Sequence, residues 1–189
     1  MSVTTNRTAD YLSPLGRMTM VSDEDSLLEL HFADRKRRET AAPASKQKIS
    51  IPLSLFIPAS PEVQDLPIFE QTKKWLDSYF HGETPVFTPQ LRLQGTEFQI
   101  MVWEILLAIP YGQTVTYGEI AARIAAQKGL AKMSAQAVGG AVGSNPIALI
   151  VPCHRVVGAK GKLIGYAAGL DKKDALLRLE YQHASQSEL

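Results

Sequence analysis

The chain holds a single cysteine, Cys153, set between Pro152 and His154 in the stretch IVPCHRVVG. A free thiol has a pKa of about 8.5, so its nucleophilic thiolate is a minority at neutral pH unless a base or a positive charge assists. The His154 imidazole and the Arg155 guanidinium are groups of the type that can give this assistance. The stretch therefore indicates nucleophilic chemistry at Cys153, and an inert buried cysteine beside a surface histidine is the alternative.

A proton relay follows from the order of these residues. Neighbouring side chains of an extended backbone point to opposite faces, so a water molecule is the natural link between Cys153 and His154. The imidazole then needs a partner on its other nitrogen to fix its tautomer. We expect Glu180 to be that partner, because a helix predicted from about Asp171 can fold back over the cysteine loop. The predicted relay is thiol, water, imidazole and carboxylate.

The composition is that of an ordinary globular protein, with 189 residues, of which 45% are apolar and 21% are charged. A single cysteine excludes internal disulfides and any zinc site built on several cysteines, and it favours a reducing, cytoplasmic setting. No stretch reaches the roughly 18 apolar residues of a membrane helix, and the polar start predicts no signal peptide. We expect a monomer with no metal, no other cofactor and no membrane association.

The net charge of +1 conceals a basic segment. Nine Lys or Arg residues lie between Arg123 and Arg178, against two acids, Asp171 and Asp174. Clustered positive charge suits a polyanionic partner such as nucleic acid, although a solvated face would give the same pattern.

The N-terminal half predicts a small α/β domain over residues 16–88, preceded by a flexible tail over residues 1–15. Residues 18–21 and 27–32 are short apolar segments around a polar turn, which is the pattern of two antiparallel strands. Residues 51–57 fit an edge strand, since Pro52 cannot donate to a ladder. Apolar residues at helical spacing predict a helix over residues 66–80 that stops near Gly82.

The remainder, residues 91–183, predicts a mostly helical domain. Thr116 and Glu119 fit a capping box, and Ser134 is placed to cap a later helix of small residues. Two such successive helices favour a helix-turn-helix, with plain helix packing as the alternative. The apolar residues 147–151 predict a short strand that delivers Cys153. The fold class is therefore α/β, or more closely α+β, with a short antiparallel sheet and a helical C-terminal domain.

Taken in order, these motifs resemble the methylated-DNA–protein-cysteine methyltransferases, also called O6-alkylguanine-DNA alkyltransferases. The resemblance covers about Gly95 to Glu180 and rests on GTEFQIMVWEILLAIPYGQTVTYGEIA, SAQAVGGAVGSNP, IVPCHRVVG, GYAAGL and LLRLE. It implies DNA repair by direct and irreversible transfer of an alkyl group from O6-alkylguanine to Cys153, with O4-alkylthymine as a second candidate substrate. It also implies double-stranded DNA as the partner, held by the helix-turn-helix in the minor groove with the damaged base rotated out. Rotation is required, because a buried thiolate cannot reach a base atom inside the stack.

The resemblance assigns roles to individual residues. The catalytic group comprises Cys153, His154, Glu180, Asn145 and Tyr117, in which Asn145 braces the turn before the active-site strand and Tyr117 donates to the departing guanine. The expected DNA-contacting residues are Lys132, Ser134, Gln136, Ala137 and Arg155. The expected base pocket is formed by Tyr117, Val156, Tyr166, Ala167 and Ala168.

Three departures from the family pattern bear on substrate range and affinity. Gln136 stands where the family often has an intercalating Arg, and Ala168 adds a methyl group where many members have Gly. The N-terminal cysteines that bind zinc in some members are missing. Two other functions remain open, a lesion-binding protein without transfer activity, which would lack the thiol, and a small-molecule cysteine hydrolase or transferase, which would turn over repeatedly.

Overall fold

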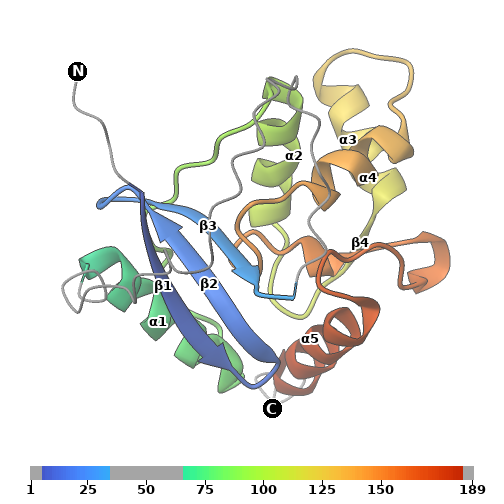
Figure 1. Cartoon of the computed structure of the whole chain (residues 1–189). Coiled ribbons are helices and arrows are strands. Elements are labelled where there is room, and N and C mark those ends of the chain that lie inside the picture. Colours follow the sequence, from blue (N-terminus) through green and yellow to red (C-terminus); the bar gives the residue numbers. More distant parts are fainter. Residues whose placement is uncertain (1–5, 35–65, 185–189) are drawn as a thin grey trace, which may run out of the picture.

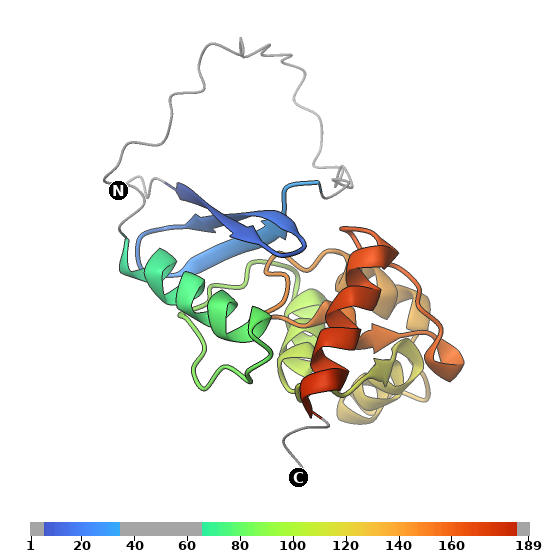
Figure 2. The same cartoon turned by 90° about the horizontal axis from the view of Figure 1, so that it is seen from below.

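The structure, a computed structural model, describes residues 6–34 and 66–184. It begins with a three-stranded antiparallel sheet of β1 (Arg7–Ser13), β2 (Gly16–Ser22) and β3 (Leu27–Phe32), in that order. Helix α1 (Pro67–Phe80) packs against all three strands, and Figure 2 shows it along one face of the sheet. The large apolar side chains Met18, Met20 and Leu30 are fully buried in this interface.

Strand β1 corrects the expected flexible tail over residues 1–15 in its part from Arg7 to Ser13, while residues 1–5 lie outside the described residues. Its residues pair one by one with β2, from Arg7 opposite Ser22 to Ser13 opposite Gly16. The strand is not evident from the sequence because its buried residues, Ala9 and Ser13, are small or polar. It therefore lacks the alternation of large apolar and polar side chains that indicates a strand. The edge strand predicted for residues 51–57 lies outside the described residues.

The C-terminal part is mostly helical and lies beside the sheet (Figure 1). Its helices are α2 (Glu97–Leu107), α3 (Tyr117–Gln127), α4 (Ala135–Gly143) and α5 (Leu170–Ala184). Two short strands, β4 (Val115–Thr116) and β5 (Val156–Val157), form a parallel pair. This arrangement confirms the predicted fold class. None of the helices within residues 6–34 and 66–184 combines the length and the apolar character needed to cross a membrane.

The starts of α3 and α4 follow the predicted capping residues. The Thr116 hydroxyl accepts the Glu119 amide at 3.1 Å, and the Glu119 carboxylate accepts the Thr116 amide at 2.7 Å. The Ser134 hydroxyl accepts the Ala137 amide at 3.3 Å. These caps fix the residue at which each helix begins. The two helices pack against each other.

The free edge of β3 ties the sheet to the C-terminal part. The Leu30 amide donates to Pro146 O at 2.9 Å, and the Ala148 amide donates to Leu30 O at 2.7 Å. The strand predicted over residues 147–151 is wrong, because only Ile147 forms a bridge, opposite Leu30, before the chain enters tight turns. Leu149 adopts a left-handed conformation with φ 67°, which ends any extended run there.

The Thr116 cap can be tested by replacing Thr116 with Ala. The free energy of unfolding should fall by about 1 kcal/mol, because the Glu119 amide loses its acceptor. Thr114→Ala is the matched control, since Thr114 is an exposed threonine outside the cap, and its effect should be close to zero. Urea unfolding measures both, and equal losses would contradict the role of the cap.

Candidate active site

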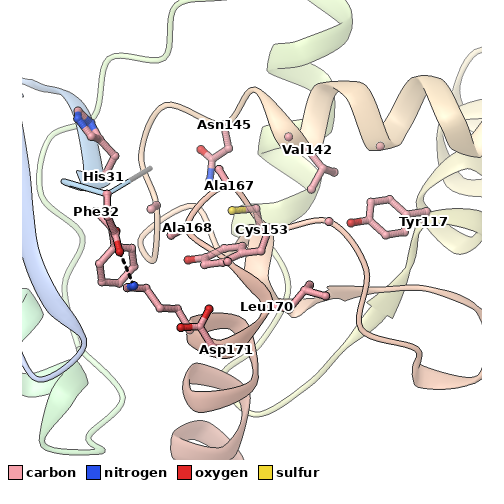
Figure 3. A pocket seen from close by; sticks show the side chains of 18 residues that line it. His31, Phe32, Tyr117, Val142, Asn145, Cys153, Ala167, Ala168, Leu170 and Asp171 are labelled. Atoms are coloured by element: carbon pink, nitrogen blue, oxygen red, sulfur yellow. Dashed lines mark hydrogen bonds and ion pairs between the residues drawn. The ribbon is translucent and has the colours of Figure 1, made fainter. Parts of the chain in front are cut away.

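Cys153 lies at the edge of a cavity of about 760 Å³ (Figure 3). The cavity is bounded by the end of β3, the start of α3, helix α4 and the loop before α5. Cys153 is half-buried and opens a 3-10 turn, Cys153–Arg155. This turn replaces the extended backbone expected here, so Cys153 and His154 do not follow the alternation of a strand. The thiol nonetheless faces a space large enough for a small organic group.

His154 and Glu180 meet behind the cavity. Both side chains are fully buried, and His154 Nε2 lies 2.6 Å from Glu180 Oε1. An ionised carboxylate can only accept hydrogen bonds, so Nε2 carries the proton and donates it to Glu180. His154 Nδ1 is buried and has no hydrogen-bond partner among the described residues. The neutral imidazole therefore presents Nδ1 as a proton acceptor.

Five donors converge on the Glu180 carboxylate. Oε1 accepts His154 Nε2, the Tyr79 hydroxyl at 2.7 Å and Arg155 Nη2 at 3.0 Å. Oε2 accepts Arg155 Nε at 2.9 Å and the Gly112 amide at 3.1 Å. Gly112 has φ 75°, and a Cβ on it would lie 2.6 Å from the Ala184 side chain. Glycine is thus required where this loop passes α5.

The electrostatics of the pair follow from burial and from these donors. Burial opposes the charge of Glu180, but the hydrogen bonds and positive charges of His154 and Arg155 prevail and lower the pKa of Glu180 to about 2. The charge of His154 contributes only in acid, where its imidazole is protonated, whereas the charge of Arg155 is always present. Burial lowers the pKa of His154, and it outweighs the opposing effect of Glu180. Arg155 supplies the charge that balances Glu180, so His154 can stay neutral beside it. The neutral His154 imidazole can then accept a proton from the Cys153 thiol at neutral pH.

Arg155 corrects one expected role. It was expected to contact DNA, but its side chain is buried, with its guanidinium on Glu180 and Nη1 donating to Ile109 O at 2.6 Å. A guanidinium donates in several directions within one plane, so it can hold a carboxylate and a carbonyl together. Arg155 therefore belongs to the interior network and not to an external surface.

Asn145 spans the turn that leads to Cys153. Its Nδ2 donates to Val151 O at 2.7 Å, and its Oδ1 accepts the Ile147 amide at 3.0 Å. Asn145 is itself buried, so these two bonds hold the turn between α4 and the cysteine without access to water. They also explain why residues 147–151 curl instead of forming a strand.

The loop before α5 forms one wall of the cavity. Tyr166, Ala167 and Ala168 line it, and the Tyr117 hydroxyl faces them across the cavity and donates to Ile164 O at 3.3 Å. Burial, and then the nearby Cys153 charge, raise the pKa of Tyr117. Its phenol is therefore protonated at neutral pH, and a base in the cavity would have to compete with Ile164 O for its proton.

Lys173 was missed by sequence reasoning. It is fully buried, and its ammonium donates to Val156 O at 2.6 Å, Ile164 O at 2.8 Å and Gly165 O at 3.3 Å. Burial lowers its pKa to about 8, against the opposing effect of Cys153. Lys173 shares the buried face of α5 with Leu176 and Glu180. This spacing of i, i+3 and i+7 is the signal in the sequence that could have found it.

Val156 differs from its expected place. Its backbone was expected to line the base pocket, but Val156 is buried in β5 and is not among the residues that line the cavity. Its carbonyl is bound by Lys173, which draws the loop before α5 onto β5.

The remaining expected DNA-contacting residues form one exposed surface. Lys132, Ser134, Gln136 and Ala137 are all exposed, in the turn before α4 and in its first turn. Ser134 uses its hydroxyl to cap α4. The structure thus separates these four residues from Arg155, which is inside.

The buried ion pairs of Glu180 predict a loss of stability in acid. Because the pKa of Glu180 is about 2, below its ordinary value of 4.5, its contribution is fully present above about pH 4.5. It is lost as the pH falls toward 2, where the folded carboxylate takes up a proton.

Glu180→Gln should lower the free energy of unfolding at pH 7 by about 3 kcal/mol, since it leaves buried Arg155 without its counter-charge. The stability of the variant should also depend less on pH between 4.5 and 2. Urea unfolding over this range, with the exposed Glu83→Gln as control, measures both effects. Parallel pH curves for the wild type and Glu180→Gln would contradict the network.

Comparisons with known proteins bear on the whole chain. Residues 97–182 match the model of the 6-O-methylguanine DNA methyltransferase DNA binding domain, and residues 7–93 match that of its ribonuclease-like domain. A methylated-DNA--protein-cysteine methyltransferase of Methanosarcina acetivorans is 43% identical, over 91% of this chain and 96% of the relative. A protein of the same description from Mycolicibacterium paratuberculosis is 41% identical, over 96% of this chain and 94% of the relative.

A solved structure agrees with these relatives. The crystal structure of Mycobacterium tuberculosis OGT in complex with DNA superposes with a TM-score of 0.70 at 41% identity, covering 94% of this chain and 93% of that one. Similarity of this extent, with both domain models matched in order, leads to one assignment: the chain belongs to the 6-O-methylguanine DNA methyltransferase family.

Proposed function

We propose that Cys153 is the thiol through which this chain carries out the activity of its family. That activity is the repair of DNA by transfer of an alkyl group from a damaged base to a cysteine of the protein. The observation that carries the assignment is the position of Cys153, at the edge of a cavity with the buried His154 and Glu180 pair behind it. The substrate proposed is O6-alkylguanine, with O4-alkylthymine as a second one.

The transfer can be written as a balanced displacement. The Cys153 sulfur attacks the alkyl carbon, the bond between that carbon and O6 breaks, and its electron pair moves onto the base. The thiol proton passes through a water molecule to His154 Nδ1. This step is supported by the burial of Nδ1 and by its lack of a hydrogen-bond partner among the described residues. The departing guanine takes a proton from the Tyr117 phenol, whose raised pKa keeps it protonated until then. The sulfur ends as a thioether, so the protein reacts once.

DNA would bind to the exposed surface at the start of α4, with that helix in the minor groove. The exposed cations of the basic segment, Arg123, Lys132, Lys160 and Lys162, can contact phosphates, whereas Arg155 and Lys173 are buried. The damaged base would leave the stack and enter the cavity, whose walls carry Tyr117, Tyr166, Ala167 and Ala168. Asn145 would keep the turn before Cys153 in place.

We further propose that the chain acts as a monomer in the cytoplasm, in keeping with its single reduced cysteine. Its two modules would fold against each other along the edge of β3: an N-terminal module that includes β1 ahead of the predicted residues 16–88, and a C-terminal module over residues 91–183. The backbone bonds between Leu30 and residues 146–148 support this proposal. No step of the displacement requires a metal or another cofactor.

Cys153 can be tested by stoichiometry. Incubation with excess duplex that contains O6-methylguanine should add one methyl group per protein, on the Cys153 peptide, and then stop. Cys153→Ser should abolish the transfer but retain duplex binding that weakens as salt rises, because the groove contacts lie on other residues. Mass spectrometry and binding titrations measure these outcomes. Repeated turnover of the substrate would instead indicate a cysteine hydrolase or transferase.

Gln136 should act in base rotation and not in the transfer itself. It is exposed in the first turn of α4, where its amide can fill the space that the base vacates. Gln136→Ala should slow repair of duplex by about tenfold, since unstacking costs a few kcal/mol, and should react normally with a free alkylated base. Gln136→Arg should keep the duplex rate and increase its dependence on salt.

Gln127→Ala is the matched control, because Gln127 is an exposed glutamine at the end of α3, and it should behave as the wild type. Single-turnover rates on methylated duplex and on the free alkylated base, measured for each variant, test whether Gln136 acts in base rotation. Equal losses on duplex and free base in Gln136→Ala would place this residue in the pocket and contradict its role in rotation.

A further inference from the structure

Helix α1 brings one tyrosine of the N-terminal domain into the relay. Tyr79 is fully buried, its hydroxyl donates to Glu180 Oε1 at 2.7 Å, and the same oxygen lies 3.3 Å from His154 Nε2. Its ring meets the imidazole edge-on, with centroids 6.3 Å apart and planes at 77°. Tyr79 therefore touches both partners of the pair, although it lies 75 residues before His154 in the chain.

The Tyr79 ring is held in a fixed orientation. Trp75, one turn earlier on α1, stacks on it at 5.4 Å with an angle of 8°, and Tyr111 packs against it edge-on at 5.9 Å. Aromatic contacts of this kind fix both side-chain torsions, so the hydroxyl cannot turn away from Glu180 without disturbing its neighbours. A neutral donor held in this way orients a carboxylate without adding charge.

We propose that Tyr79 is a positioning residue for proton transfer from Cys153, supplied by the N-terminal domain. Its hydroxyl and His154 Nε2 both donate to Glu180 Oε1. The hydroxyl thereby fixes the orientation of the carboxylate, which keeps the imidazole proton on Nε2. Nδ1 is then left unprotonated on the side of the cysteine. It also takes up part of the negative charge of Glu180, so that His154 stays neutral. This inference rests on the proposed function of Cys153, His154 and Glu180.

The groups that face His154 come from several elements. Glu180 and Lys173 lie on α5, Arg155 on the same 3-10 turn and Tyr79 on α1. Tyr111, on the loop after α2, packs against the Tyr79 ring. Cys153 precedes His154 directly. Of these, Glu180 favours the imidazolium, whereas Arg155 and Lys173 disfavour it.

The sign of the effect of Tyr79 follows from this balance. Removing its hydroxyl leaves Glu180 with one donor fewer, so the carboxylate stabilises an imidazolium more strongly. The pKa of His154 then rises. Since a charged imidazole cannot accept the thiol proton, transfer should fail at a higher pH than in the wild type.

The test uses the full-length chain with Tyr79→Phe, which removes only the hydroxyl. The matched control is Tyr111→Phe, because the buried Tyr111 hydroxyl has no hydrogen-bond partner among the described residues and packs against the same ring. Single-turnover transfer from duplex containing O6-methylguanine is measured from pH 5 to 9 for the three proteins. Thermal unfolding is followed in parallel.

We expect Tyr79→Phe to react about tenfold more slowly at neutral pH, the loss that corresponds to one hydrogen bond to a charged group. The acid midpoint of its pH profile should move to higher pH, and its apparent affinity for duplex should not change. Tyr111→Phe should keep the rate and midpoint of the wild type.

Two results would overturn the inference while leaving the function of Cys153 intact. One is a Tyr79→Phe protein with the wild-type rate and midpoint. The other is a fall in rate that Tyr111→Phe shares, with neither midpoint moved, since this would be an effect of packing. A wild-type chain that transfers no methyl group in the same assay would overturn the proposed function, and the role of Tyr79 with it.

Discussion

The buried carboxylate of Glu180 is the constraint on which the rest of the site depends. A buried charge is costly unless it is paired and fully hydrogen-bonded, and Glu180 meets this condition through donors from Tyr79, Gly112, His154 and Arg155. These donors come from α1, from the loop before β4 and from the turn that begins with Cys153. One side chain on α5 therefore fixes the relative positions of segments that are far apart in the sequence.

This network also sets the protonation state that the chemistry needs. Because Arg155 balances the charge of Glu180, the histidine can remain neutral and accept a proton. A second buried network, in which Lys173 binds three carbonyls, holds the cavity wall before α5 against β5. Cys153, at the edge of the cavity, directly precedes His154 of the first network, and Gly165, whose carbonyl Lys173 binds, lines the cavity. The shape of the cavity therefore depends on polar contacts as well as on the apolar core.

Much of this site could be predicted from the sequence, because its motifs are local. The stretch around Cys153 indicates a nucleophile with a base, and the caps at Thr116 and Ser134 mark where α3 and α4 begin. The pairing of His154 with Glu180 required only a helix that folds back over a loop. The residues that the sequence misplaced are those whose environment is set by distant parts of the chain.

Arg155 illustrates this limit. A lone arginine beside a catalytic motif suits DNA as well as it suits a buried carboxylate, and only the packing of α5 decides between them. Tyr79 and Lys173 are not singled out by the sequence for the same reason, because their buried partners come from other segments of the chain. Strand β1 was missed because its inward residues are small, and residues 147–151 were taken for a strand because the side-chain bonds of Asn145 cannot be read from apolar content.

The central claim is that Glu180 holds a neutral His154 with its proton on Nε2. The ¹⁵N NMR shifts of the His154 ring in the unmodified protein at pH 7 test it most directly, because the two nitrogens of a neutral imidazole differ in shift according to which one is protonated. We predict the pattern of a neutral ring with a protonated Nε2 and an unprotonated Nδ1. A ring protonated on Nδ1, or on both nitrogens, would contradict the account.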